Sequence, residues 1–179
     1  MAGSHALLLP IAVFLVLSFG AAPSASTNDA DLLHQVCSKV TFKDLCISSL
    51  GSDPSSSTAD INKLAVLSVQ VAKEHAKATY SYIEHLLNST AGDPSLQQSL
   101  TDCSDVYVDI VEQLEDSISA FSEKQYKNIN TWVSAAVSDV QTCDDGFKEQ
   151  QVERSPLVQK NAITSNLCSN VLAILKMLG

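Results

Sequence analysis

The stretch that decides the fold runs from Asp93 to Phe121 and reads DPSLQQSLTDCSDVYVDIVEQLEDSISAF. Its apolar side chains recur every three or four residues, at positions 96, 100, 103, 107, 110, 114, 118 and 121. This spacing is typical of the buried face of an α-helix, which turns once every ~3.6 residues. Asp93 is a favourable N-cap, and Pro94 suits the first helical position. The stretch therefore predicts one long amphipathic helix.

Three other stretches show the same periodicity: residues 58–87, residues 126–147, and the segment that begins at Ser155-Pro156. The connections between them are short, roughly four to eight residues, and short connections make neighbouring helices antiparallel. Two shorter helical stretches, 30–39 and 42–50, come earlier in the chain. We therefore expect an all-α fold, with an up-down-up-down four-helix bundle over residues 58–179 and a small N-terminal helical hairpin over residues 30–51. Residues 30–179 together are expected to form one domain.

In the first long helix, one stripe of apolar or small residues falls at positions 61, 64, 68, 71, 75, 78, 82 and 86. A second stripe beside it holds residues 65, 69, 72, 76 and 83. His75 lies on the first stripe, so we expect a partly buried packing residue there. His85 falls near the end of the helix.

The cysteine positions agree with this helical plan. Cys103 and Cys143 are equally far from residue 123, where the second and third long helices meet. Two antiparallel helices joined there would place these cysteines opposite each other, at the Cα separation of about 5.5 Å that a disulfide requires. Cys168 then remains as a buried free thiol.

Cys37 and Cys46 require a bend between them. On one continuous helix their Cα atoms would lie about 13 Å apart, too far for a disulfide. The chain is therefore expected to fold back near residues 40–41, and the two cysteines to pair. Zinc is the alternative role for cysteines, but no Cys-x-x-Cys occurs and His34, His75 and His85 lack ligand spacing. We expect no metal and no other cofactor.

The N-terminal segment predicts secretion. The apolar run Ala6–Leu17 is followed by small residues up to Ser26, as in a signal peptide covering residues 1–25 and cleaved at about 22–26. No later run is apolar for long enough to predict a membrane span. We therefore expect an extracellular protein. Asn88-Ser89-Thr90 is a glycosylation sequon, with Asn88 as the acceptor.

The charge pattern narrows the class of partner. The formal net charge is −9, and all charged residues follow the predicted signal peptide. This argues against nucleic acid and against anionic membranes. Five carboxylates share one face of the second long helix: Asp102, Asp105, Asp109, Glu112 and Asp116. They form either a simply solvated face or a docking surface for a basic protein.

No pattern in the sequence predicts catalysis. There is no Gly-x-Ser-x-Gly motif, no Gly-rich phosphate loop and no pair of Glu-x-x-His motifs. Glycosidases place two carboxylates across a cleft, whereas the acidic row lies along one convex helix. We therefore expect no enzymatic activity.

Three segments resemble the signatures of the plant invertase and pectin methylesterase inhibitors. They are CSKVTFKDLCISSL at Cys37–Leu50, LTDCSDVY at Leu100–Tyr107 and TCDDGF at Thr142–Phe147. The start of the first long helix and the segment DGFKE are most similar to the pollen proteins named "putative invertase inhibitor", some of which are allergens.

The resemblance implies a secreted inhibitor that occludes the active-site cleft of pectin methylesterase or acid invertase. Inhibitors of invertase resemble one another in a Pro-Lys-Phe stretch between the second and third long helices. Here that stretch corresponds to Lys124-Gln125-Tyr126, followed by Lys127. Together with Asp105, Asp109 and Glu112, these four residues are the candidate target-binding residues. The alternative is a non-inhibitory pollen or apoplastic helical bundle that is either allergen-like or a carrier of an apolar ligand.

Overall fold

The computed structural model of the protein describes residues 27–89 and 92–179. The predicted signal peptide, residues 1–25, lies outside the described residues. Within those two ranges the chain is helical and has no strand. In chain order the elements are α1 (Thr27–Ser38), α2 (Lys43–Gly51), the 3-10 helix η1 (Pro54–Thr58), α3 (Ile61–Ser89), α4 (Pro94–Ala120), the 3-10 helix η2 (Phe121–Glu123), α5 (Tyr126–Glu149) and α6 (Val158–Leu175).

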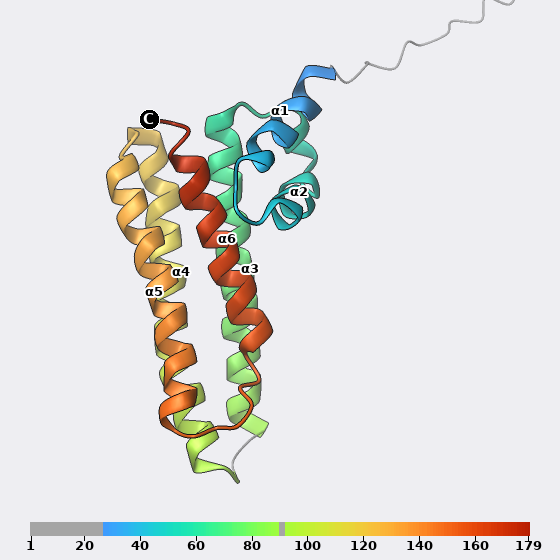
Figure 1. The fold of residues 1–179 in the computed structure, drawn as a ribbon. Helices are drawn as coiled ribbons and strands as arrows, with labels where there is room; N and C mark the ends of the chain where they lie inside the picture. The colour runs from blue at the N-terminus through green and yellow to red at the C-terminus, as the bar shows by residue number, and fades with distance from the viewer. Residues whose placement is uncertain (1–26, 90–91) are drawn as a thin grey trace, which may run out of the picture.

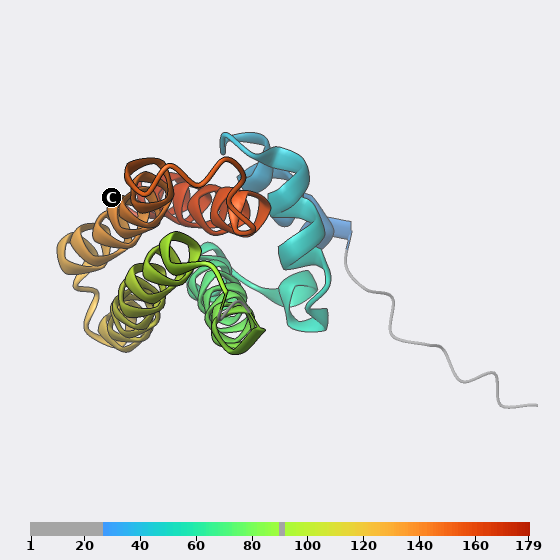
Figure 2. The ribbon, with the colours of Figure 1, turned by 90° about the horizontal axis from the view of Figure 1, so that it is seen from below.

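The long helices α3 to α6 form an antiparallel bundle (Figure 1). α4 packs against α3 and α5, and α6 closes the bundle by packing against α5 and α3. The short helices α1 and α2 form a hairpin on the side made by α3 and α6, as the view along the bundle shows (Figure 2). The expected fold class, a four-helix bundle preceded by a small helical hairpin, is confirmed.

The helix starts follow local capping chemistry, with one difference from expectation. The Asp93 carboxylate accepts a hydrogen bond from the Leu96 backbone N–H at 3.1 Å, as its position before Pro94 predicts. The prediction that the last helix starts at Ser155-Pro156 is wrong by two or three residues, because α6 begins at Val158. Leu157 is fully buried there, and its N–H donates to the Ser155 hydroxyl at 3.1 Å, so the cap residue organises a turn before the helix.

The bundle core is built from side chains of all four helices. On α4, Leu100, Tyr107, Ile110 and Leu114 are fully buried. Burying each large apolar side chain contributes about 1.5–3 kcal/mol relative to exposure. On α3 the second stripe, at positions 65, 69, 72, 76 and 83, is the fully buried one. The first stripe is mixed: Leu64 and Ser68 are buried, whereas Ala78 is exposed.

The hairpin is attached to the bundle at two places. Its own small core continues into α3 and α6 through Leu64 and Ile174. The turn between α1 and α2 is also attached to α6 by one amide side chain, that of Asn170. Asn170 accepts from the Phe42 N–H at 3.0 Å and donates to the Phe42 carbonyl at 2.9 Å. This pair satisfies both backbone groups at the N-cap of α2.

Two disulfides close the two parts of the molecule. Cys37 and Cys46 are bonded across the hairpin with Cα atoms 5.5 Å apart. Cys103 on α4 and Cys143 on α5 are bonded with Cα atoms 4.7 Å apart. Cys168 is a buried free thiol, and its burial raises the pKa of that thiol to about 12. Such a thiol is a packing group, because the reactive thiolate is suppressed.

Candidate interaction surface

A buried polar cluster links all four long helices. The Tyr107 hydroxyl donates to Asn161 Oδ1 at 2.8 Å, and its oxygen lies 3.2 Å from Thr164 Oγ1. Asn161 Nδ2 in turn donates to Asp144 Oδ1 at 2.6 Å. His75 Nδ1 lies 3.0 Å from Thr164 Oγ1. Each polar group is engaged by another member, so the cluster is a structural brace.

The titration behaviour of this cluster also argues for a structural role. Burial raises the pKa of the Tyr107 hydroxyl well above its ordinary value. Burial, and secondarily the charge of Lys160, lower the pKa of His75. Both groups are therefore held neutral at physiological pH. Periodicity places His75 and Tyr107 on helix stripes but does not predict that Thr164 links them. The polar residues Asn161 and Thr164 on the buried side of α6 are the signal in the sequence for this cluster.

The outer face of α4 is acidic. Asp105, Asp109 and Glu112 are exposed there, pointing away from the buried face of the same helix. Asp102 and Asp116 extend the row toward the two ends. Within residues 27–89 and 92–179, ion pairs join Lys73 to Glu74 and Glu115 and Lys148 to Asp145, so no row member is ion-paired. The row is thus a convex, solvated strip of negative charge.

The α4–α5 connection reverses the chain within a few residues. Lys124 adopts the left-handed conformation with φ 54°, and its N–H donates to the Phe121 carbonyl at 3.1 Å. The Gln125 N–H donates to the Ala120 carbonyl at 3.1 Å, which completes a helix C-terminal motif. The Gln125 side chain donates to the Glu123 carboxylate and accepts from Asn128 Nδ2. Gln125 is therefore held within its own connection, whereas Lys124 and Lys127 are exposed.

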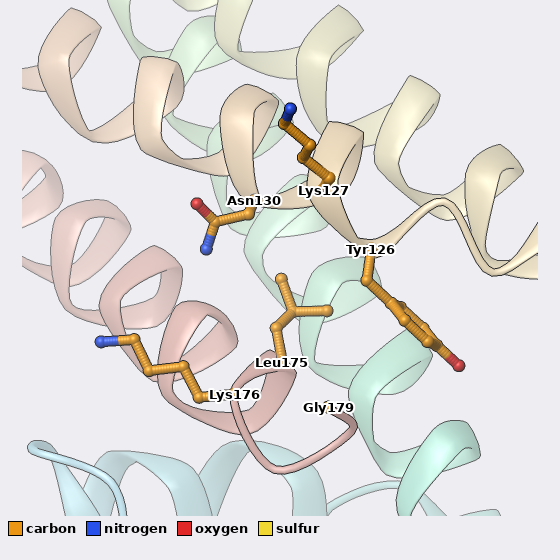
Figure 3. Close-up of a pocket in the computed structure, with 6 residues that line it drawn as sticks. All are labelled: Tyr126, Lys127, Asn130, Leu175, Lys176 and Gly179. Carbon is orange, nitrogen blue, oxygen red and sulfur yellow. The ribbon is translucent and has the colours of Figure 1, made fainter.

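Tyr126 anchors this connection to the start of α3. Its hydroxyl donates to Asn62 Oδ1 at 3.0 Å, and its ring meets Phe121 edge-on with centroids 6.3 Å apart. A hollow of about 370 Å³ lies between the start of α5 and the C-terminal end of α6. It is lined by Tyr126, Lys127, Asn130, Leu175, Lys176 and Gly179. Figure 3 shows Lys127 and Asn130 projecting from α5, and Lys176 on the opposite side of Leu175 from Tyr126.

The two groups of candidate residues form separate patches. Glu112 and Lys124 are twelve positions apart, which is about 18 Å along a helix axis. The acidic strip and the connection therefore share the α4–α5 pair without merging into one site.

The structure describes only part of the expected glycosylation sequon. Asn88 is exposed at the end of α3, and Thr90 lies outside the described residues.

Hollows among the described residues lie at the surface. Five of them, of 290 to 510 Å³, are each bordered by exposed polar side chains and so open to solvent. In residues 27–89 and 92–179 no group of three His, Cys, Asp or Glu side chains is placed to hold a metal ion. Over the same residues, no helix is both long and apolar enough to cross a membrane.

Comparison with known proteins agrees with this architecture. The family model for plant invertase/pectin methylesterase inhibitors matches residues 31–174. The "Putative invertase inhibitor" of Platanus acerifolia is 37% identical over 156 residues, which cover 84% of this chain and 87% of that protein. The "Pectinesterase inhibitor" of Actinidia deliciosa is 29% identical over 170 residues, covering 95% of this chain and 91% of that one.

Among solved structures, a mutant form of an Arabidopsis pectin methylesterase inhibitor superposes with a TM-score of 0.69 at 23% identity. The match covers 81% of this chain and 95% of that structure, which shows a shared fold. With a family model that spans both disulfides and all the long helices, the chain belongs to the plant invertase/pectin methylesterase inhibitor family.

Proposed function

We propose that this chain is a secreted protein inhibitor that binds a plant carbohydrate-active enzyme, pectin methylesterase or acid invertase, and occludes its active-site cleft. In this proposal residues 1–25 are removed as a signal peptide, and residues 30–179 act as one inhibitor domain in the apoplast. Asn88 is its glycosylation site. The observation that carries the proposal is the family match over residues 31–174.

In this proposal the two patches have different roles. The acidic strip of Asp105, Asp109 and Glu112 attracts a target with a basic rim and speeds association. The α4–α5 connection lies at one end of the bundle, held by the Tyr126–Asn62 hydrogen bond and by the backbone hydrogen bonds of Lys124 and Gln125. A connection held in this way enters a cleft with little loss of conformational entropy.

Between the two targets, the connection favours pectin methylesterase. The position that corresponds to the lysine of Pro-Lys-Phe is occupied by Gln125, which carries no charge and is tied to Glu123 and Asn128. It therefore presents no cation to the acidic site of an invertase. Lys124 and Lys127 flank it and are exposed, so they are the residues through which an invertase would still be engaged.

The experiment is direct. Purified mature protein is titrated into several isoforms of plant pectin methylesterase and of acid invertase at mildly acidic pH, and residual activity is measured. We expect stoichiometric loss of pectin methylesterase activity and weaker or no loss of invertase activity. A Gln125→Lys variant is expected to gain inhibition of invertase. If every isoform of both enzymes keeps its full activity at excess protein, the proposal is wrong.

The alternative, a carrier of apolar ligands, is not favoured. Such a carrier needs an apolar chamber between its helices, whereas Leu100, Ile110, Leu114, Ile129 and Val133 are fully buried and pack together in the bundle core. The described hollows lie at the surface and are bordered by polar residues.

A further inference from the structure

Positive charge is concentrated at one end of this acidic molecule. The formal net charge is −9, with 11 Lys and Arg in the whole sequence. Lys63 and Lys124 line a hollow of about 380 Å³ beside the α4–α5 connection. Lys127 and Lys176 line the hollow of about 370 Å³ shown in Figure 3. Tyr126 borders both hollows, so the four lysines surround one aromatic side chain, and we call them the lysine end.

The lysine end keeps an excess of positive charge. Lys63, Lys124, Lys127 and Lys176 are all exposed. In the described part of the chain the ion pairs involve only Lys73 and Lys148. Two carboxylates adjoin the lysine end in sequence and reduce its charge without cancelling it. Asp60 accepts from the Lys63 backbone N–H at 2.8 Å, and Glu123 accepts from Gln125.

The lining of the two hollows suits an anionic carbohydrate. Among the described residues, no Asp or Glu lines either hollow. The other polar side chains of the lining are uncharged amides and hydroxyls: Asn62, Asn130, Ser122 and Tyr126. Amide and hydroxyl groups hydrogen-bond sugar hydroxyls, and ammonium groups attract carboxylates. Because the lysines lie on both sides of Tyr126, they match an extended chain that repeats its negative charge.

We propose that the lysine end binds a linear uronate polysaccharide in its de-esterified form, whose sugars each carry a free carboxylate. The choice of a uronate polymer rests on the proposed function, because pectin methylesterase hydrolyses uronate methyl esters and leaves carboxylates. The lysines attract the carboxylate and not the neutral ester. The free inhibitor, before its α4–α5 connection engages an enzyme, is thereby retained where its target enzyme has already acted.

Binding is tested with two probes of equal chain length: de-esterified polygalacturonate oligomers and the same oligomers fully methyl-esterified. The full mature chain is used, and affinity is measured by calorimetry at several salt concentrations. We expect binding of the de-esterified oligomer alone, weakening as salt rises because the charges are exposed. The double variant K63Q/K176Q, outside the candidate target-binding residues, is expected to bind on the order of fivefold more weakly.

A matched control variant and three contrary outcomes test the proposal. K77Q/K148Q removes the same charge from the middle of α3 and the far end of α5, and it should leave binding unchanged. Equal affinity for both oligomers, or an equal loss in both double variants, would overturn the proposal. So would sedimentation showing that the lysine end instead binds the acidic strip of a second copy.

Polysaccharide binding and enzyme inhibition are measured separately, so either can fail without the other. A chain that binds the oligomer but inhibits neither enzyme leaves the lysine end intact and refutes inhibition. A chain that inhibits an enzyme but does not bind the oligomer refutes polysaccharide binding at the lysine end and leaves the proposed inhibition intact.

Discussion

The bundle and the hairpin both bury apolar surface between helices, but they differ in the number and length of the helices that supply it. The bundle packs four long helices around a continuous core that includes the Tyr107–Asn161 hydrogen bond. The hairpin has two short helices, and its small core is completed only by residues of α3 and α6. A structure with few apolar contacts of its own opens first when a protein is stressed. The hairpin should therefore be the weaker region, dependent on its disulfide and on Asn170.

The largest effects come from removing the disulfides. Replacing Cys103 and Cys143 by Ser should lower the free energy of unfolding by about 4 kcal/mol, because this bond closes the longer loop. Replacing Cys37 and Cys46 should cost about 3 kcal/mol. Denaturant titration of both variants measures the difference. If the hairpin variant proved the less stable of the two, loop length would not be what sets the cost.

The next largest effect tests how the hairpin is attached. Asn170→Ala removes both hydrogen bonds to the Phe42 backbone. The Phe42 carbonyl still accepts from the Cys46 N–H, whereas the half-buried Phe42 N–H loses its partner, at a cost of about 1–3 kcal/mol. Hydrogen exchange should accelerate in residues 32–50, while the α4–α5 pair keeps its protection.

Asn166→Ala on the same helix is the control, because Asn166 lines a surface hollow on the α5–α6 side. It should leave exchange in the hairpin unchanged. Uniform acceleration across the whole chain in N170A would mean that hairpin and bundle open as one unit.

The comparison also separates what the sequence predicts from what it hides. The stripe on α4 predicts its buried face, because a lone helix with one apolar side has one way to pack. On α3 the sequence shows two adjacent stripes, and periodicity does not predict which of them is buried. Three neighbouring elements pack on this helix, and Ala78 of the first stripe faces solvent. Local periodicity describes one helix at a time and carries no information about how many partners it meets.

The candidate patches show the same limit. Period 3.6 places Asp105, Asp109 and Glu112 on one outer face, and the structure has them exposed there. The lysine end has no such signal, because Lys63, Lys124 and Lys176 come from three separate segments. The bond between Asn170 and Phe42 joins positions 128 residues apart, so only the tertiary fold reveals it.

A smaller effect concerns pH, and it belongs to the bundle alone. The pKa of His75 is lowered in the folded protein, chiefly by burial. As pH falls below the unfolded value of about 6.5, the unfolded chain takes up a proton before the folded one does. Stability is therefore complete above that pH and decreases through the window down to the folded pKa.

Because His75 is only half-buried, solvent screening keeps this loss to about 1 kcal/mol or less. Thermal melts between pH 4 and pH 8 measure it, with His75→Gln expected to flatten the slope. His34→Gln, on the exposed side of α1, is the control and should leave the slope as it is. An identical slope in H75Q and in the unmodified protein would assign the pH dependence to other groups.

The smallest effect on stability comes from the acidic strip, although its effect on binding is larger. Asp105→Lys, Asp109→Lys and Glu112→Lys together replace exposed groups on a convex face, so the free energy of unfolding should change by about 0.5 kcal/mol or less per substitution. Association with a basic target should slow by about tenfold at low salt, with little change in the dissociation rate.

Stopped-flow measurement of the association rate distinguishes the effect of where the negative charges lie from the effect of the total net charge. The control reverses three other exposed carboxylates, Asp44, Glu149 and Glu153, which gives the same net charge away from the strip. If both triple variants slow association equally, net charge alone steers the encounter and the strip is merely solvated. If only the strip variant slows it, the outer face of α4 meets the target first, and the bundle rather than the hairpin orients the complex.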